Sequence, residues 1–134
     1  MTGEHEIRSV LARLVMAWND ADRESFVSCF AEDVEMDSPV GFGVFRGRDD
    51  VALRFDEGHP ATGHMTIEHE YLVVADSEAA VFVANCGEID GEPFVQSSIE
   101  IYTFDDSGHI SRARAFVEGG EAWAAQLETA RARA

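Results

Sequence analysis

The stretch SSIEIYTFDDSGHISRARAF, residues 97–116, decides the fold class. Two extended runs flank DDSG at 105–108, and the Asp, Ser and Gly residues there favour a tight reversal of the chain. This pattern predicts an antiparallel hairpin. A second turn at DGE, 90–92, joins the hairpin to further extended runs and predicts a meander. The four predicted strands cover 65–75, 79–89, 93–104 and 109–118.

The first half of the chain is predicted to be mainly helical. Apolar residues recur at steps of three and four along one expected helix, at Ile7, Val10, Leu11, Leu14, Val15 and Trp18. Asp22 is the expected N-cap of a second short helix, and Val34 and Met36 mark a brief strand. A helix over 48–55 and a loop over 57–64 complete this half. Helices followed by a meander predict an α+β fold, with helices on one face of a curved sheet.

Length and charge narrow the class of protein. A chain of 134 residues suits one core of ordinary size, so we expect a single domain over residues 1–134. The net charge is −16 and all ten cationic side chains are arginine, so the surface repels phosphate backbones and anionic lipid. We therefore expect no nucleic-acid or membrane partner. The chain has no apolar run long enough to span a bilayer and no basic, apolar leader, which predicts a cytoplasmic protein.

Strand alternation sorts the side chains of the meander into two faces. One face combines small and polar residues, as expected where a sheet lines a cavity: Val83, Asn85, Gly87, Gln96, Ser98, Glu100, Tyr102, Ala113, Ala115 and Val117. The other face mixes apolar and arginine side chains, as a contact between two copies of a sheet would: Phe82, Ala84, Cys86, Ile99, Ile101, Arg112, Arg114 and Phe116. In this arrangement Glu100 is expected near Ala113.

Three segments together resemble a known family. They are ARLVMAWNDADRESFVSCFAEDVEMDSPVG (12–41), FRGRDDVALRF (45–55) and the hairpin at 97–116. They resemble the ketosteroid isomerase branch of the nuclear transport factor 2-like (NTF2-like) superfamily, which includes the SnoaL-like polyketide cyclases. The resemblance implies a cone, a cystatin-like α+β barrel, in which a curved antiparallel or mixed sheet wraps around the N-terminal helices and encloses one deep apolar pocket. It also implies a homodimer, here through the convex face of the sheet.

The resemblance assigns catalytic positions only in part. Glu100 falls where the isomerases carry a protonated aspartic acid that donates to an oxyanion, and such a neutral acid needs an apolar setting. The position of the general base is Ser38, that of the oxyanion tyrosine is Leu14, and that of a supporting tyrosine is Phe55. Serine without a base of its own does not abstract a proton near neutral pH, and leucine has no donor.

For several residues the sequence leaves two interpretations open, one functional and one structural. Asp37 supplies the missing base if its strand is bulged by one residue; otherwise it faces solvent while Ser38 caps the turn before Pro39. Glu100 faces the pocket or pairs outward with an arginine across the hairpin. Tyr102 donates through its hydroxyl or is an aromatic core residue. The candidate catalytic residues are Glu100, Asp37 and Ser38, and the candidate substrate-binding residues are Leu14, Trp18, Phe55, Val83, Asn85, Ser98, Tyr102, Ala115 and Val117.

Metal ions and cofactors are not expected. His59, His64 and His69 are read as exposed residues near a loop, and their spacing matches no zinc motif. The favoured function is cofactor-free acid/base proton transfer, as isomerisation or cyclisation, on an apolar cyclic or polyketide-like molecule. The alternatives are a non-catalytic binding or accessory protein that kept the pocket, an epoxide hydrolase of the same fold, and a dimeric interaction module.

Overall fold

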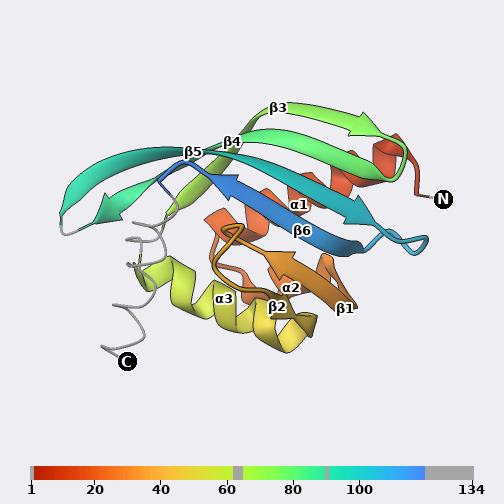
Figure 1. Cartoon of the computed structure of the whole chain (residues 1–134), viewed down its shortest axis with the longest axis horizontal. Coiled ribbons are helices and arrows are strands. Elements are labelled where there is room, and N and C mark those ends of the chain that lie inside the picture. The colour runs from red at the N-terminus through yellow and green to blue at the C-terminus, as the bar shows by residue number, and fades with distance from the viewer. Residues whose placement is uncertain (1, 62–64, 90, 120–134) are drawn as a thin grey trace.

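The computed structural model describes residues 2–61, 65–89 and 91–119 (Figure 1). The helices and strands in chain order are α1 (Glu4–Asn19), α2 (Arg23–Ser28), β1 (Phe30–Asp37), β2 (Phe45–Arg46), α3 (Gly47–Ala61), β3 (Thr66–Ala75), β4 (Glu78–Ile89), β5 (Glu92–Phe104) and β6 (Ile110–Val117). Helices come first and the long strands last, which confirms the predicted α+β class.

One curved sheet organises the molecule. Its six strands follow the order β2-β1-β6-β5-β4-β3, and it stays open, with β2 and β3 at its edges. Strand β1 runs parallel to β6, whereas the other neighbours are antiparallel, so the sheet is mixed. Figure 1 shows the long strands arching over α1, with α2 and α3 on the same side of the sheet.

The apolar face of α1 fills the hollow of the sheet. The predicted periodicity is confirmed, because Ile7, Leu11 and Leu14 are almost fully buried. Asp22 caps α2 as expected, its carboxylate accepting a hydrogen bond from the backbone N–H of Ser25 at 3.2 Å. No helix in the described part of the chain is both long enough and apolar enough to cross a bilayer.

Helix α3 is longer than the sequence predicts. The expected loop over 57–64 is wrong for its first part, because α3 continues through Gly58 and His59 to Ala61. Packing accounts for the difference. A Cβ atom on Gly58 would lie 2.8 Å from the Trp18 ring, so the absence of a side chain lets α3 approach α1. His59, expected to be exposed, is buried against Trp18 and Phe55, with ring centroids 4.0 and 4.2 Å away. Residues 62–64, including His64, lie outside the described residues.

The register of the meander preserves the predicted faces. Val83 pairs with Ser98 and Asn85 with Gln96, as expected. Glu100 pairs with Ala115, two residues from the expected neighbour Ala113, and a register shift between Thr103 and Phe104 accounts for one of these two residues. The difference is two residues, and side chains alternate with a period of two, so no residue changes face. The convex face exposes apolar side chains, among them Phe82, Ile99 and Phe116.

Candidate functional site

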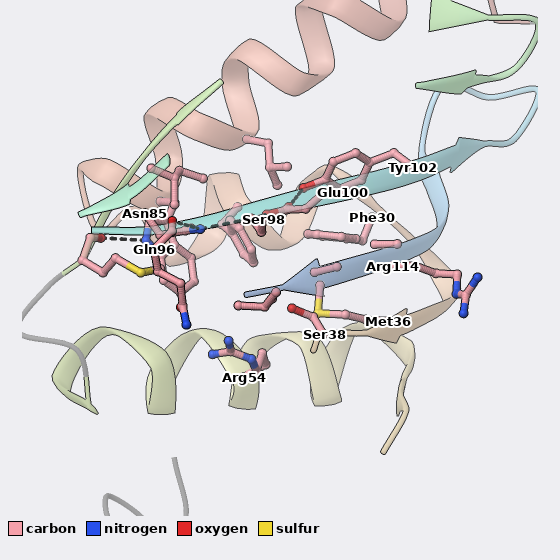
Figure 2. Close-up of a pocket in the computed structure, with 18 residues that line it drawn as sticks. Phe30, Met36, Ser38, Arg54, Asn85, Gln96, Ser98, Glu100, Tyr102 and Arg114 are labelled. Atoms are coloured by element: carbon pink, nitrogen blue, oxygen red, sulfur yellow. Dashed lines mark hydrogen bonds between the residues drawn. The ribbon is translucent and has the colours of Figure 1, made fainter. Parts of the chain in front are cut away.

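A cavity lies between the concave face of the sheet and the helices (Figure 2). The cavity volume open to the centre of a water molecule is about 90 Å³. A single water needs only a fraction of this volume. The residues that line it are Leu14, Trp18, Phe26, Phe30, Met36, Ser38, Arg54, Met65, Ile67, Asn85, Gln96, Ser98, Glu100, Tyr102, Ala113, Arg114, Ala115 and Val117. Its wall is thus apolar on α1, α2 and β1, and carries most of its polar groups on β4, β5 and α3.

Glu100 is the centre of a hydrogen-bond network on β5. Residues 98, 100 and 102 are spaced by two and therefore share the concave face. The Tyr102 hydroxyl donates to Glu100 Oε1 in a short bond, and the Ser98 hydroxyl donates to Glu100 Oε2 at 3.0 Å. Asn85 Nδ2 on β4 donates to Ser98 Oγ at 3.1 Å and to the Gln96 carbonyl at 3.0 Å. Each oxygen of the Glu100 carboxyl thus has a donor, and the acid is held in one orientation.

Burial sets the proton affinity of this network. Glu100 is half-buried, and the cavity is the space that it faces. Desolvation raises the pKa of Glu100 above its ordinary value, although the hydrogen bonds from Tyr102 and Ser98 and the charge of Arg54 act in the opposite direction. Burial and the neighbouring Glu100 raise the pKa of Tyr102 well above its ordinary value. Tyr102 therefore stays protonated near neutral pH and remains a donor, whereas Glu100 is the group that can exchange a proton with a ligand.

Most of the predicted site residues meet at this cavity. Those that line it are Leu14, Trp18, Ser38, Asn85, Ser98, Glu100, Tyr102, Ala115 and Val117. Phe55 and Val83 do not line it. Phe55 packs behind the wall, its ring centroid 5.3 Å from that of Trp18, and Val83 is wholly buried in the core. Trp18 is fixed in the wall because its indole N–H donates to the Met65 carbonyl at 2.8 Å.

Asp37 lies on the outer side of β1. Its register with β6 is continuous from Met36 to Asp37, which pair with Ala113 and Arg114, so no bulge turns the Asp37 side chain inward. Alternation instead points Met36 into the core. The Asp37 carboxylate lies 3.9 Å from Arg114 Nε. Ser38 lines the cavity without a carboxylate beside it on β1, and the acid of this site is Glu100 on β5.

Arg54 is a charged residue of the cavity that is not among the predicted site residues. It is only 6% exposed and reaches the cavity from α3, on the side away from β5 (Figure 2). A signal was present in the sequence: Arg54 stands three residues after the buried Val51, on the apolar face of the helix. Gln96 also lines the cavity, and strand alternation had already assigned it to the concave face.

Histidine and acidic side chains do not gather into a metal site in the described ranges. Nowhere in residues 2–61, 65–89 and 91–119 do three or more His, Cys, Asp or Glu side chains lie close enough together to hold an ion. His59 lies between backbone carbonyls, its Nε2 2.8 Å from the Trp18 oxygen and its Nδ1 3.2 Å from the Phe55 oxygen. His69 on β3 is partly buried, and burial lowers its pKa.

One curated protein and several solved structures match the chain over most of its length. A steroid Δ-isomerase of Nocardioides simplex is 25% identical over 118 residues, which are 87% of this chain and 93% of the relative. The epoxide hydrolase/cyclase-like enzyme SalBIII, with a role in pyran ring formation in polyether salinomycin, has a TM-score of 0.80 at 22% identity, over 88% of this chain and 95% of its own.

Two further structures share the fold at lower identity. A computationally designed 17-OHP binder has a TM-score of 0.74 at 21% identity, over 83% of this chain and 92% of its own. RV0760c from Mycobacterium tuberculosis, in complex with estradiol-17β-hemisuccinate, has a TM-score of 0.70 at 20% identity, over 83% of this chain and 92% of its own.

A match to a family model shows which family the chain belongs to. The SnoaL-like domain model matches residues 11–113, a span that begins within α1 and ends within β6 and so includes most of the elements that build the cavity wall. The predicted membership in the NTF2-like superfamily is confirmed, and the chain belongs to the family of SnoaL-like domains.

Proposed function

We propose that this protein is a cofactor-free enzyme that moves a proton on a small, apolar cyclic molecule, with Glu100 as the proton-transfer group. One observation carries the proposal: among the described residues that line the cavity, Glu100 is the single carboxyl group, and its pKa is raised by burial. A raised pKa makes a carboxyl a better proton acceptor when ionised and lets it keep its proton to higher pH, and both properties favour general acid/base catalysis.

A single carboxyl suffices for isomerisation of an unsaturated ketone. Ionised Glu100 removes a proton from the carbon next to the carbonyl, so that a C–H bond breaks, an O–H bond forms and an enolate results. Glu100 then returns the same proton to the far end of the conjugated system, the carbonyl re-forms and the double bond has moved. Tyr102 remains protonated throughout and holds Glu100 by its hydrogen bond. The apolar walls keep bulk water away from the enolate.

The related proteins support the substrate class. The relative in Nocardioides simplex is a steroid Δ-isomerase, and SalBIII is epoxide hydrolase/cyclase-like. The designed protein binds 17-OHP, and RV0760c is found with an estradiol derivative. We therefore propose a rigid ring system, steroid-like or polyketide-like, that lies against the wall formed by Leu14 and Trp18.

The test is turnover of a β,γ-unsaturated 3-ketosteroid, followed by the ultraviolet absorbance of its conjugated product. We expect Glu100→Gln to lower kcat by about 10² or more, the usual contribution of a positioned acid or base. The matched control is Glu92→Gln, an exposed glutamate of the same strand, which should leave kcat unchanged. Because Glu100 must start ionised, kcat/KM should rise with pH and level off above the raised pKa of Glu100. Turnover that survives Glu100→Gln would remove Glu100 from this role.

A second candidate is a binding protein without chemistry. It is favoured by the replacement of two expected catalytic groups, since the positions of the base and of the oxyanion tyrosine hold Ser38 and Leu14. Calorimetric binding of the steroid product, together with no turnover by the unmodified protein over hours, would favour this candidate. Epoxide opening by a hydrolase or cyclase fits the same site. Glu100 would give its proton to the epoxide oxygen as that C–O bond breaks, and would take up the proton of the water or hydroxyl nucleophile as the new C–O bond forms.

We also propose that the protein is a homodimer and that its two copies associate through the convex face of the sheet. Each copy is proposed to be a single domain, and the dimer is proposed to be cytoplasmic. Ile99 and Phe116 pair across β5 and β6 and are half exposed there. Ile99→Asp should shift sedimentation from dimer to monomer while ligand binding stays intact, because residue 99 faces away from the cavity. A monomeric unmodified protein at micromolar concentration would refute the dimer.

A further inference from the structure

A buried arginine faces the same cavity as Glu100. Arg54 is among the most buried polar residues of the described chain, although a guanidinium is charged at every physiological pH. The backbone makes room for it: a Cβ on Gly58, one helical turn later, would lie 2.5 Å from Arg54 Nη1. Gly58 thus gives the guanidinium its place beside the Trp18 ring.

Arg54 brings a positive charge to the helix side of the cavity. The other charged or titratable residues of the lining are Glu100 and Tyr102 on β5 and Arg114 on β6. The Arg114 guanidinium carbon lies 5.0 Å from the centroid of the Phe116 ring, and Phe116 belongs to the convex face. On α3 itself, Glu57 and His59 flank the turn that carries Arg54. Arg54 therefore supplies the cationic group on the wall away from β5.

We propose that the ligand of this pocket is an organic anion, an apolar ring that carries a carboxylate, and that Arg54 binds this carboxylate. The inference rests on the proposed function, since it names the substrate class of the same cavity. A guanidinium binds a carboxylate through two parallel N–H···O bonds, which fixes the direction of the ligand as well as its charge. The rings of Trp18 and Phe26 and the thioether of Met36 then contact the apolar part. The reacting carbon is left on the side of Glu100.

An anionic ligand couples to the protonation of Glu100. The ligand carboxylate and an ionised Glu100 repel each other inside the same cavity, and both interact with Arg54. The ligand thus binds better when Glu100 is protonated. Its affinity should be highest at low pH and should fall as pH rises through the pKa of Glu100. A neutral ligand of the same shape should lack this dependence.

The experiment compares two isosteric probes, 2-naphthoate and 2-naphthamide, by titration calorimetry in about 0.15 M salt, where the charge of the surface is screened beyond roughly 8 Å. For the unmodified protein at neutral pH we expect naphthoate to bind about tenfold or more tightly than naphthamide, the usual strength of a charge-assisted hydrogen bond. Arg54→Met should abolish this preference. Arg8→Met, which removes an exposed arginine of α1, should keep it.

A second arm uses only the unmodified protein and Glu100→Gln, so it does not depend on Arg54→Met folding. The naphthoate affinity of the unmodified protein should decline with rising pH, over a range in which the probe stays ionised, and Glu100→Gln should remove the decline. Equal binding of the two probes would overturn the inference and leave the proposed function standing, because an apolar ring still enters the cavity. No binding of either probe would count against both. Since naphthoate forms no enolate, a role of Arg54 confined to turnover would also appear as equal binding.

Discussion

Removing the Tyr102 hydroxyl tests the network that holds Glu100. Tyr102 is 4% exposed, and its hydroxyl donates to Glu100 Oε1. Tyr102→Phe keeps the ring and deletes this donor. A hydrogen bond to a charged acceptor stabilises a fold by about 1.5–3 kcal/mol, and one between neutral groups by about 0.5–1.5 kcal/mol. We therefore expect Tyr102→Phe to lower the free energy of unfolding by the larger amount when Glu100 is ionised and by the smaller amount when it is protonated.

The sign of the pH dependence follows from the raised pKa of Glu100. The folded state holds its proton to a higher pH than the unfolded state, so this group stabilises the fold fully below the unfolded pKa. That contribution is lost as pH rises through the folded pKa. Tyr102→Phe removes an interaction that lowers this pKa, so in the variant the loss should extend to higher pH.

Urea unfolding followed by circular dichroism, at a series of pH values, measures these differences. The cycle includes Glu100→Gln, in which residue 100 is neutral at every pH. In that background Tyr102→Phe should cost only about 0.5–1.5 kcal/mol, and the cost should not vary with pH. The reasoning is refuted if Tyr102→Phe costs the same in both backgrounds at high pH, because the hydroxyl would then not be bonded to a carboxylate.

Two further changes test the packing of α3 and the N-cap of α2. Gly58→Ala places a methyl group 2.5 Å from Arg54 Nη1 and 2.8 Å from Trp18 Cη2, and it should destabilise the fold by about 1–3 kcal/mol in urea unfolding, although alanine favours helices. A Gly58→Ala variant that is more stable than the unmodified protein would contradict the close approach. Asp22→Ala removes the cap of α2 and should cost about 0.5–2 kcal/mol, whereas Asp22→Ser should recover most of the loss; equal stability of the two variants would argue against capping.

The sequence predicts the parts of the fold that depend on local periodicity. The helical spacing along α1 places apolar residues on one side, and that side is buried in the structure. Alternation along β4 and β5 separates the two faces correctly, with Asn85 and Ser98 buried on the concave face and Phe82 exposed on the other. Alternation also explains why Glu100 lies on the predicted face although its predicted neighbour on β6 is wrong. The pairing differs by two residues, and only an odd difference would have moved Glu100 to the convex face.

Tertiary contacts account for what the sequence does not predict. Glycine and proline near the end of α3 signal a loop, but the packing of Gly58 and His59 against Trp18 keeps the helix intact. Arginine is usually exposed at the surface. The burial of Arg54 depends on the space that Gly58 leaves one helical turn away. Neither effect is visible without knowing which helix packs against which.

In the proposed function one carboxyl acts alone, and the position of that acid on β5 accounts for its fixed orientation. Ser98 and Tyr102 are each two residues from Glu100, so the strand aims both hydroxyls at the same carboxyl, and a regular strand holds a side chain more rigidly than a loop does. Ser38, at the position of the usual base, follows the end of β1. Orientation of Glu100 therefore depends on the registers of β4, β5 and β6. A slip of one residue would turn Ser98, Glu100 and Tyr102 outward together, so the same pairing that buries the core also maintains the candidate site.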